Sequence, residues 1–123
     1  MTMSIASYFS PSAETRELHY DAQLKTRYYR NSFKDCLKVT ETLAETMNMD
    51  IRDVNEKHGE INLIGNGFDA ILTVTQVTPI ETGIDIKINF FSFVGLGRPK
   101  RKVIALYKYF DQNLKFKGVA LHP

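Results

Sequence analysis

The chain has 123 residues, 43% of them hydrophobic and 24% charged, which is the composition of one globular domain and excludes a disordered or fibrous protein. No apolar run reaches the ~18 residues of a membrane-spanning helix, and the first residues lack the basic and apolar stretches of a secretory signal. The single cysteine, Cys36, cannot form an internal disulfide, so we expect a cytoplasmic protein.

The net charge is only +2, but it is unevenly distributed. Residues 1–30 carry +1, residues 31–94 carry −5 and residues 95–123 carry +6. The basic end either serves an anionic partner or is attracted to the acidic middle within one fold.

The chain begins with residues 1–20, which are rich in serine and show little periodicity, so we expect a loose N-terminal arm before a single domain over 21–123. A strand is expected near 21–29 from its β-forming Thr26, Tyr28 and Tyr29. Because neighbouring residues of a strand face opposite sides, the two tyrosines place an aromatic ring on each face.

A helix is predicted over 32–48. Ser32 and Asp35 resemble a capping box, and apolar residues then recur at steps of three and four. Asn48 stands where a helix commonly ends.

Four strands are predicted next, over 49–56, 60–64, 69–78 and 84–94, because apolar residues alternate with polar ones between turn signals. The alternation breaks at the end of the last strand, where Phe91 and Phe93 fall on the polar face. Either a β-bulge turns both rings toward the core, or the N-terminal arm or a second subunit covers them.

A second helix is predicted over 99–115, with Pro99 in its first turn, and an extended tail after Gly118. Strands joined by tight turns are antiparallel, so the expected fold class is α+β, in the order β-α-β-β-β-β-α with both helices on one sheet face. Over residues 22–115 this order of elements resembles the TATA-box-binding-protein-like fold, which includes the helix-grip lipid and hormone carriers. The resemblance concerns topology alone and implies no single function.

The sequence shows no enzyme signature. His19, His58 and His122 lie on separate predicted segments, and Cys36 lies on the apolar stripe of the first helix. The segment GLGRPKRK lacks both the third glycine of a dinucleotide fingerprint and the Gly-Lys-Ser/Thr of a P-loop. We therefore expect no catalytic residues, no metal and no cofactor.

Basic residues crowd the start of the second helix, where the helix dipole disfavours cations. An anion held there by the free N–H groups would explain them, and a solvated basic turn is the alternative. The candidate anion-binding residues are Arg98, Lys100, Arg101 and Lys102.

Three functions are compatible with these patterns. The first is a small non-enzymatic binding domain that self-associates, as a homodimer, through the aromatic residues Tyr28, Tyr29, Phe91 and Phe93. The second is binding of nucleic acid or another anionic ligand at the basic start and stripe of the C-terminal helix. The third is an apolar carrier of helix-grip type, with a cavity lined by Ile88, Phe90, Tyr107 and Phe110.

Overall fold

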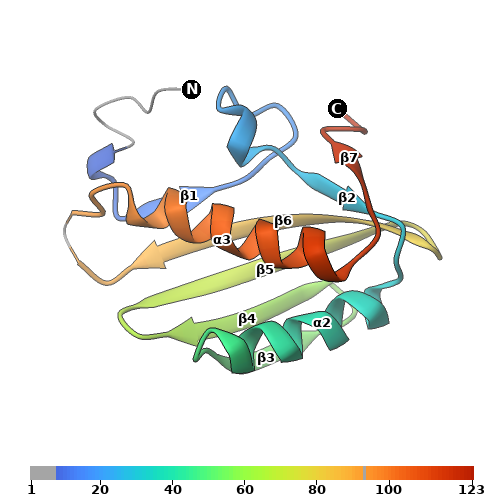
Figure 1. Cartoon of the computed structure of the whole chain (residues 1–123), viewed down its shortest axis with the longest axis horizontal. Coiled ribbons are helices and arrows are strands. Elements are labelled where there is room, and N and C mark those ends of the chain that lie inside the picture. The colour runs from blue at the N-terminus through green and yellow to red at the C-terminus, as the bar shows by residue number, and fades with distance from the viewer. Residues whose placement is uncertain (1–7, 93) are drawn as a thin grey trace.

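The fold is an antiparallel sheet with two helices on one face, as shown by a computed structural model that describes residues 8–92 and 94–123 (Figure 1). The strands are β1 (Ser12–Glu14), β2 (Arg27–Tyr29), β3 (Asp50–Asn55), β4 (Glu60–Gly65), β5 (Phe68–Thr78), β6 (Glu81–Phe90) and β7 (Phe116–Val119). The helices are α2 (Phe33–Thr46) and α3 (Arg98–Asn113), with a short 3-10 helix η1 (Ala22–Leu24) before β2. The expected α+β class is confirmed.

The strand order is β3-β4-β5-β6-β2-β7. The strand β1 lies off this path and pairs with β6 at residues 87–89, next to the place where β2 pairs with residues 82–84. One edge of β6 is therefore shared by two short strands that follow one another along it.

The ends of both helices follow from local sequence. Ser32 and Asp35 form the expected capping box, in which each side chain accepts a hydrogen bond from the other's backbone N–H at 3.2 Å. After α2, Asn48 adopts the left-handed conformation (φ 53°) that ends many helices. The helix α3 follows Gly97, at φ 75°, and has Pro99 in its first turn.

The core lies between the helices and the inner face of the sheet. Ile84, Ile86 and Ile88 alternate along β6 and are fully buried, as the sequence pattern predicts. Leu106 and Phe110 project from α3 into the same core cluster and are also fully buried.

The N-terminal arm differs from its prediction. Residues 12–14 are a strand of the sheet, and Thr15 N–H donates to the Ile86 carbonyl at 2.9 Å, so this part of the arm is not loose. The edge of β6 beyond β2 offers backbone groups that need partners, and β1 satisfies them. Residues 1–7 lie outside the described residues.

The end of β6 also differs. The pairing of β5 with β6 stays in register to Phe68 and Phe90, so the proposed bulge is absent there and the strand stops before Phe91. Phe91 follows the strand and is 60% exposed, so the described part of the arm, from residue 8 onward, leaves it largely uncovered. Phe93 lies outside the described residues.

Candidate functional site

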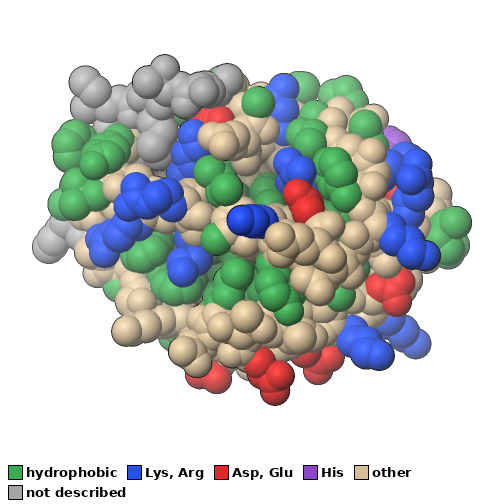
Figure 2. Space-filling model, viewed as in Figure 1, with side chains coloured by type: hydrophobic (Ala, Val, Ile, Leu, Met, Phe, Trp, Pro, Cys, Tyr) green, Lys and Arg blue, Asp and Glu red, His purple; other side chains and the backbone are tan. Residues whose placement is uncertain are grey.

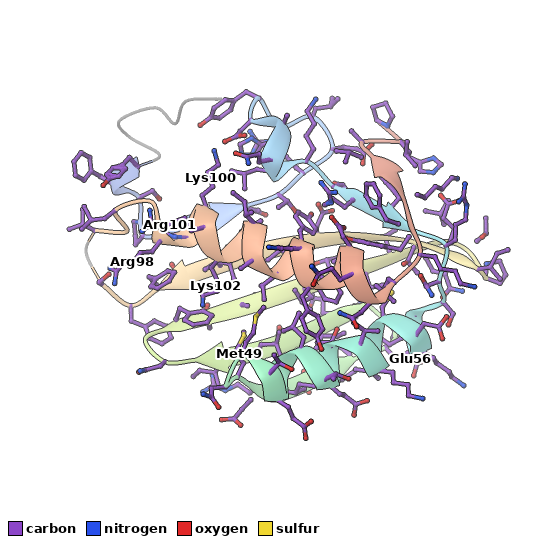
Figure 3. The ribbon with its side chains drawn as sticks, viewed as in Figure 1. Met49, Glu56, Arg98, Lys100, Arg101 and Lys102 are labelled. Carbon is purple, nitrogen blue, oxygen red and sulfur yellow. The ribbon has the colours of Figure 1, made fainter. Side chains whose placement is uncertain are left out.

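A groove of about 320 Å³ opens where the start of α3 meets the β4–β5 turn and the end of β6. We call it the basic groove; its lining residues are Asn66, Phe68, Phe90, Arg98, Arg101, Lys102 and Ala105. Four of these come from α3 at positions separated by three or four residues, so they share one side of the helix. Figure 3 shows Arg98, Arg101 and Lys102 at this end of the molecule.

Two stacked phenylalanines form the floor of the basic groove. Phe68 and Phe90 are directly opposite one another on β5 and β6, and their ring centroids are 5.2 Å apart. The Arg98 guanidinium lies 4.9 Å from the centroid of Phe90, and the Lys102 ammonium lies 4.9 Å from that of Phe68. These cation–π contacts hold two of the three groove cations close to the floor.

The three cations differ in how far their hydrogen bonding is satisfied. Arg98 donates to the carbonyls of Gly95 and Val94 and to the hydroxyl of Ser92, at 2.8–3.0 Å, so its guanidinium fastens the β6–α3 loop. The side chains of Arg101 and Lys102 make no hydrogen bond or ion pair with any residue that the structure describes. These two side chains are available to an anion. The backbone N–H groups of Gly97, Arg98 and Arg101 donate to carbonyls within the chain, so the side chains are the donors that such an anion would use.

The loop before α3 and most of the helix itself offer no carboxylate to neutralise the cations of the basic groove. The chain has no acidic residue between Asp85 and Asp111, an interval that includes the whole β6–α3 loop and most of α3. Like charges gathered at a helix N-terminus are unfavourable by roughly 0.3–1 kcal/mol each at low salt, and a bound anion would relieve that cost.

Lys100 is the predicted anion-binding residue that the structure places elsewhere. Its side chain leaves α3 on the side that faces the N-terminal segment (Figure 3) and forms an ion pair with Asp21 at 2.7 Å. The two side chains are only 8% and 3% exposed. Lys100 already has a carboxylate partner, so the candidate anion site is reduced to Arg98, Arg101 and Lys102.

Asp21 organises the surroundings of this ion pair. Its carboxylate accepts from the Gln23 N–H at 3.0 Å and so caps η1, and its own N–H donates to His19 Nδ1 at 3.0 Å. Burial would raise the pKa of Asp21, but the hydrogen bonds from Lys100 and Gln23 outweigh it and hold that pKa below its ordinary value. Asp21 is therefore ionised at neutral pH and matches the charge of Lys100.

A second pocket, of about 240 Å³, lies beside the ion pair and includes Arg16, His19 and Lys100 in its lining. Burial, followed by the charge of Arg16, lowers the pKa of His19, so its imidazole is neutral at physiological pH. Since Nδ1 accepts a hydrogen bond, the proton of the neutral ring is on Nε2. The cations here are balanced by Asp21 and by Glu14 in the pocket wall, which distinguishes this pocket from the basic groove.

The two tyrosines proposed as an interface are buried within the chain. Tyr29 is fully buried, and its hydroxyl donates to Asp111 at 2.7 Å beside the Arg27–Asp111 ion pair. Tyr28 is 6% exposed, and its hydroxyl donates to Glu17 at 2.6 Å. Neither ring is presented to a partner, and of the four proposed interface residues only Phe91 is described and exposed.

The single cysteine lies in the core. Burial raises the pKa of the Cys36 thiol, whose Sγ lies 3.2 Å from the Thr82 hydroxyl in the core. Within residues 8–92 and 94–123, no three His, Cys, Asp or Glu side chains are grouped as metal ligands would be. The same residues include no helix with the length and apolarity needed to cross a bilayer.

Asp85 is the half-buried centre of a polar cluster at the shared edge of β6. Its Oδ1 accepts from the hydroxyls of Thr15 and Thr26, each at 2.7 Å, and Tyr107 donates to Thr15 from α3 at 3.1 Å. Burial raises the pKa of Asp85, and the two threonine hydrogen bonds only partly oppose it. The cluster ties β1, β2 and α3 to β6.

Replacing Asp85 with asparagine is expected to leave the protein at least as stable as the wild type at pH 7, because an amide oxygen accepts both threonine hydroxyls without a half-buried charge. The folded protein holds the Asp85 proton more tightly than the unfolded chain. The wild type therefore loses stability relative to Asp85→Asn as the pH rises through the raised pKa, and the two proteins converge in acid. Urea unfolding from about pH 3 to pH 7 measures this difference; a variant that is less stable than the wild type at pH 7 and matches it in acid would show that the cluster needs the charge.

The comparisons with known proteins identify no family to which the chain could be assigned. No protein-family model matches the sequence, and no curated protein is significantly similar to it.

Proposed function

We propose that the chain is a non-enzymatic, cytoplasmic binding domain that holds a phosphate-bearing anion in the basic groove. The observation that carries this proposal is the pair of cations Arg101 and Lys102, whose side chains have no hydrogen bond or ion pair among the described residues, beside an aromatic floor at the start of α3. Phosphate oxygens suit this arrangement, since they accept several charge-assisted hydrogen bonds from arginine and lysine side chains.

The other two functions have less support. Self-association was expected from four aromatic residues, of which Tyr28 and Tyr29 are buried within the chain. An apolar carrier would need a cavity at Ile88, Tyr107 and Phe110, yet these side chains are at least 97% buried and pack in the core cluster. Phe90 belongs to the basic groove instead.

Inorganic phosphate is expected to raise the melting temperature of the wild type, while the variant Arg101→Gln/Lys102→Gln should not respond. A ligand that binds only the folded protein stabilises it by mass action, by about 1.4 kcal/mol at ten times Kd. This corresponds to a few degrees for a domain of this size. Thermal unfolding followed by circular dichroism, with and without phosphate at constant ionic strength, measures the effect.

The matched control is Lys34→Gln/Lys38→Gln, which removes two exposed lysines from α2, away from the basic groove. This control should respond to phosphate as the wild type does. Equal shifts in all three proteins would contradict the proposal, because they would mean that phosphate acts through the solvent or through charges elsewhere.

A further inference from the structure

Exposed apolar side chains gather next to the basic groove. Five large residues, each 40–60% exposed, come from the segment before β1 and from the loop between β6 and α3. We call them the apolar tip: Tyr8, Phe9, Phe91, Val94 and Leu96. In Figure 2, hydrophobic side chains lie at the same end of the molecule as the cluster of Lys and Arg side chains at the start of α3. Such a patch on a surface is typical of an interaction site.

Backbone contacts hold the apolar tip in place. Gly95 N–H donates to the Phe9 carbonyl at 3.1 Å, and Gly97 N–H donates to the Tyr8 carbonyl at 2.8 Å. A Cβ at Gly95 would lie 2.0 Å from the Ser10 carbonyl oxygen, so only glycine allows the two segments to approach this closely. On the other side, Phe91 N–H donates to the Gly67 carbonyl at 2.9 Å. The backbone of the apolar tip is therefore held in a defined position by hydrogen bonds to neighbouring segments.

Leu96 is strained as well as exposed. Its φ of 52° lies in the left-handed region, where glycine and asparagine are common and a leucine is costly. The side chain is 45% exposed, so burial within the chain does little to offset this cost. A strained backbone that presents an apolar side chain to solvent points to a use for that side chain outside the chain.

Along the chain, the charged residues that flank the apolar tip are basic, while Asp69 on β5 lies opposite Asn89. Arg98 is hydrogen-bonded to Ser92 and Val94 in the tip loop, and the two unpartnered groove cations follow on α3. Neither residues 8–13 nor residues 86–110 include an acidic residue. A partner that matches this surface has an apolar layer to contact the apolar tip and anionic groups to contact the cations.

We propose that this partner is an anionic membrane surface: the apolar tip inserts at the boundary between headgroups and acyl chains, while Arg101 and Lys102 bind lipid phosphates. This inference rests on the proposed function, since it names the source of the phosphate. A nucleic acid would satisfy the cations but would leave aliphatic side chains such as Val94 and Leu96 in water. Apolar insertion and attraction to anionic lipids together give reversible binding without a spanning segment.

Co-sedimentation with vesicles tests the inference. The wild type should bind phosphatidylcholine vesicles that contain roughly 30% phosphatidylserine, and bind poorly to pure phosphatidylcholine. Arg101→Gln/Lys102→Gln should reduce the partition coefficient on the order of 30-fold, since each surface cation contributes roughly a factor of five.

The decisive variant is Phe91→Ser/Leu96→Asn, which removes two apolar side chains and keeps every cation. Asparagine tolerates the left-handed backbone at position 96, so the variant should fold. It should lose binding to anionic vesicles while keeping the thermal shift in phosphate. The matched control, Val77→Ser/Ile80→Ser, removes exposed apolar side chains from the opposite end of the β5–β6 pair, about 30 Å away, and should bind as the wild type does.

The outcomes separate the two proposals. If phosphate stabilises the wild type but anionic vesicles do not bind, the membrane inference fails and the anion site stands. If Phe91→Ser/Leu96→Asn binds vesicles as tightly as the wild type does, the apolar tip is not the contact and the inference is overturned. If a single-stranded oligonucleotide binds wild type and this variant equally and vesicles do not bind, the partner is a nucleic acid. If phosphate gives no shift that depends on Arg101 and Lys102, the proposed function itself fails.

Discussion

Replacing Lys100 with methionine is expected to lower the free energy of unfolding by about 3 kcal/mol, at the lower end of the range for breaking a buried ion pair. The substitution leaves the carboxylate of Asp21, 3% exposed, without its cation. The adjoining pocket of about 240 Å³ gives that carboxylate some access to water, which limits the loss. Urea unfolding at pH 7 measures it.

Two controls separate the ion pair from the general effects of removing a lysine. Lys108→Met, at an exposed position of the same helix, should change stability by less than about 0.5 kcal/mol. Asp21→Asn/Lys100→Met should recover most of the lost stability, because the amide oxygen still accepts from Gln23 and no unpaired charge is buried. A Lys100→Met variant as stable as Lys108→Met would mean that Asp21 is well solvated without its partner.

Replacing Leu106 with alanine should lower the free energy of unfolding by about 2–5 kcal/mol, the cost of lost apolar contact plus the cavity that remains. Leu106 is fully buried in the middle of α3 and belongs to the core cluster between the helices and the sheet. For a domain of this size the loss is a large part of the total stability. Thermal and urea unfolding both report it.

Gln112→Ala is the comparison on the exposed side of the same helix, and we expect it to change stability by no more than about 0.5 kcal/mol. If Leu106→Ala costs less than ~1 kcal/mol, then the core rearranges around the substitution and α3 contributes less to the core than its burial indicates.

The helices and the longer strands could be predicted because their signals are local. A stripe of apolar residues at steps of three and four marks α2 and α3, and strict alternation marks β6. The capping box of Ser32 and Asp35 involves residues only three positions apart, so it too could be read from the sequence.

Features that depend on contacts between residues far apart in the sequence could not be predicted in this way. The strand β1 has three residues and no periodicity, and it exists because a free edge of β6 lies beside it. Lys100 differs from its neighbours because helical geometry turns it toward Asp21, 79 positions earlier in the chain. Lys100 therefore lies on a different side of α3 from its sequence neighbours Arg101 and Lys102, which line the basic groove.

The candidate site shows the same division. The cations Arg98, Arg101 and Lys102 were predicted from their crowding at a helix start, but the aromatic floor was not. Phe68 and Phe90 are separated by 22 positions and meet only through the register of β5 with β6. The available signal was one phenylalanine just before the predicted strand 69–78 and another near the end of the predicted strand 84–94, and it becomes specific only when the register of the two strands is known.

The place of β2 and α3 in the fold affects how a nascent chain becomes structured. The strand β2 is made before β6 and β7, yet it lies between them in the sheet, so both of its partners are synthesised after it. Until α3 has emerged, the inner face of β6, with Ile84, Ile86 and Ile88, lacks part of its cover. The N-terminal part of this chain therefore cannot complete its folding before the C-terminal part is made. During synthesis the apolar inner face of the sheet is partly exposed, and such a face is prone to aggregate.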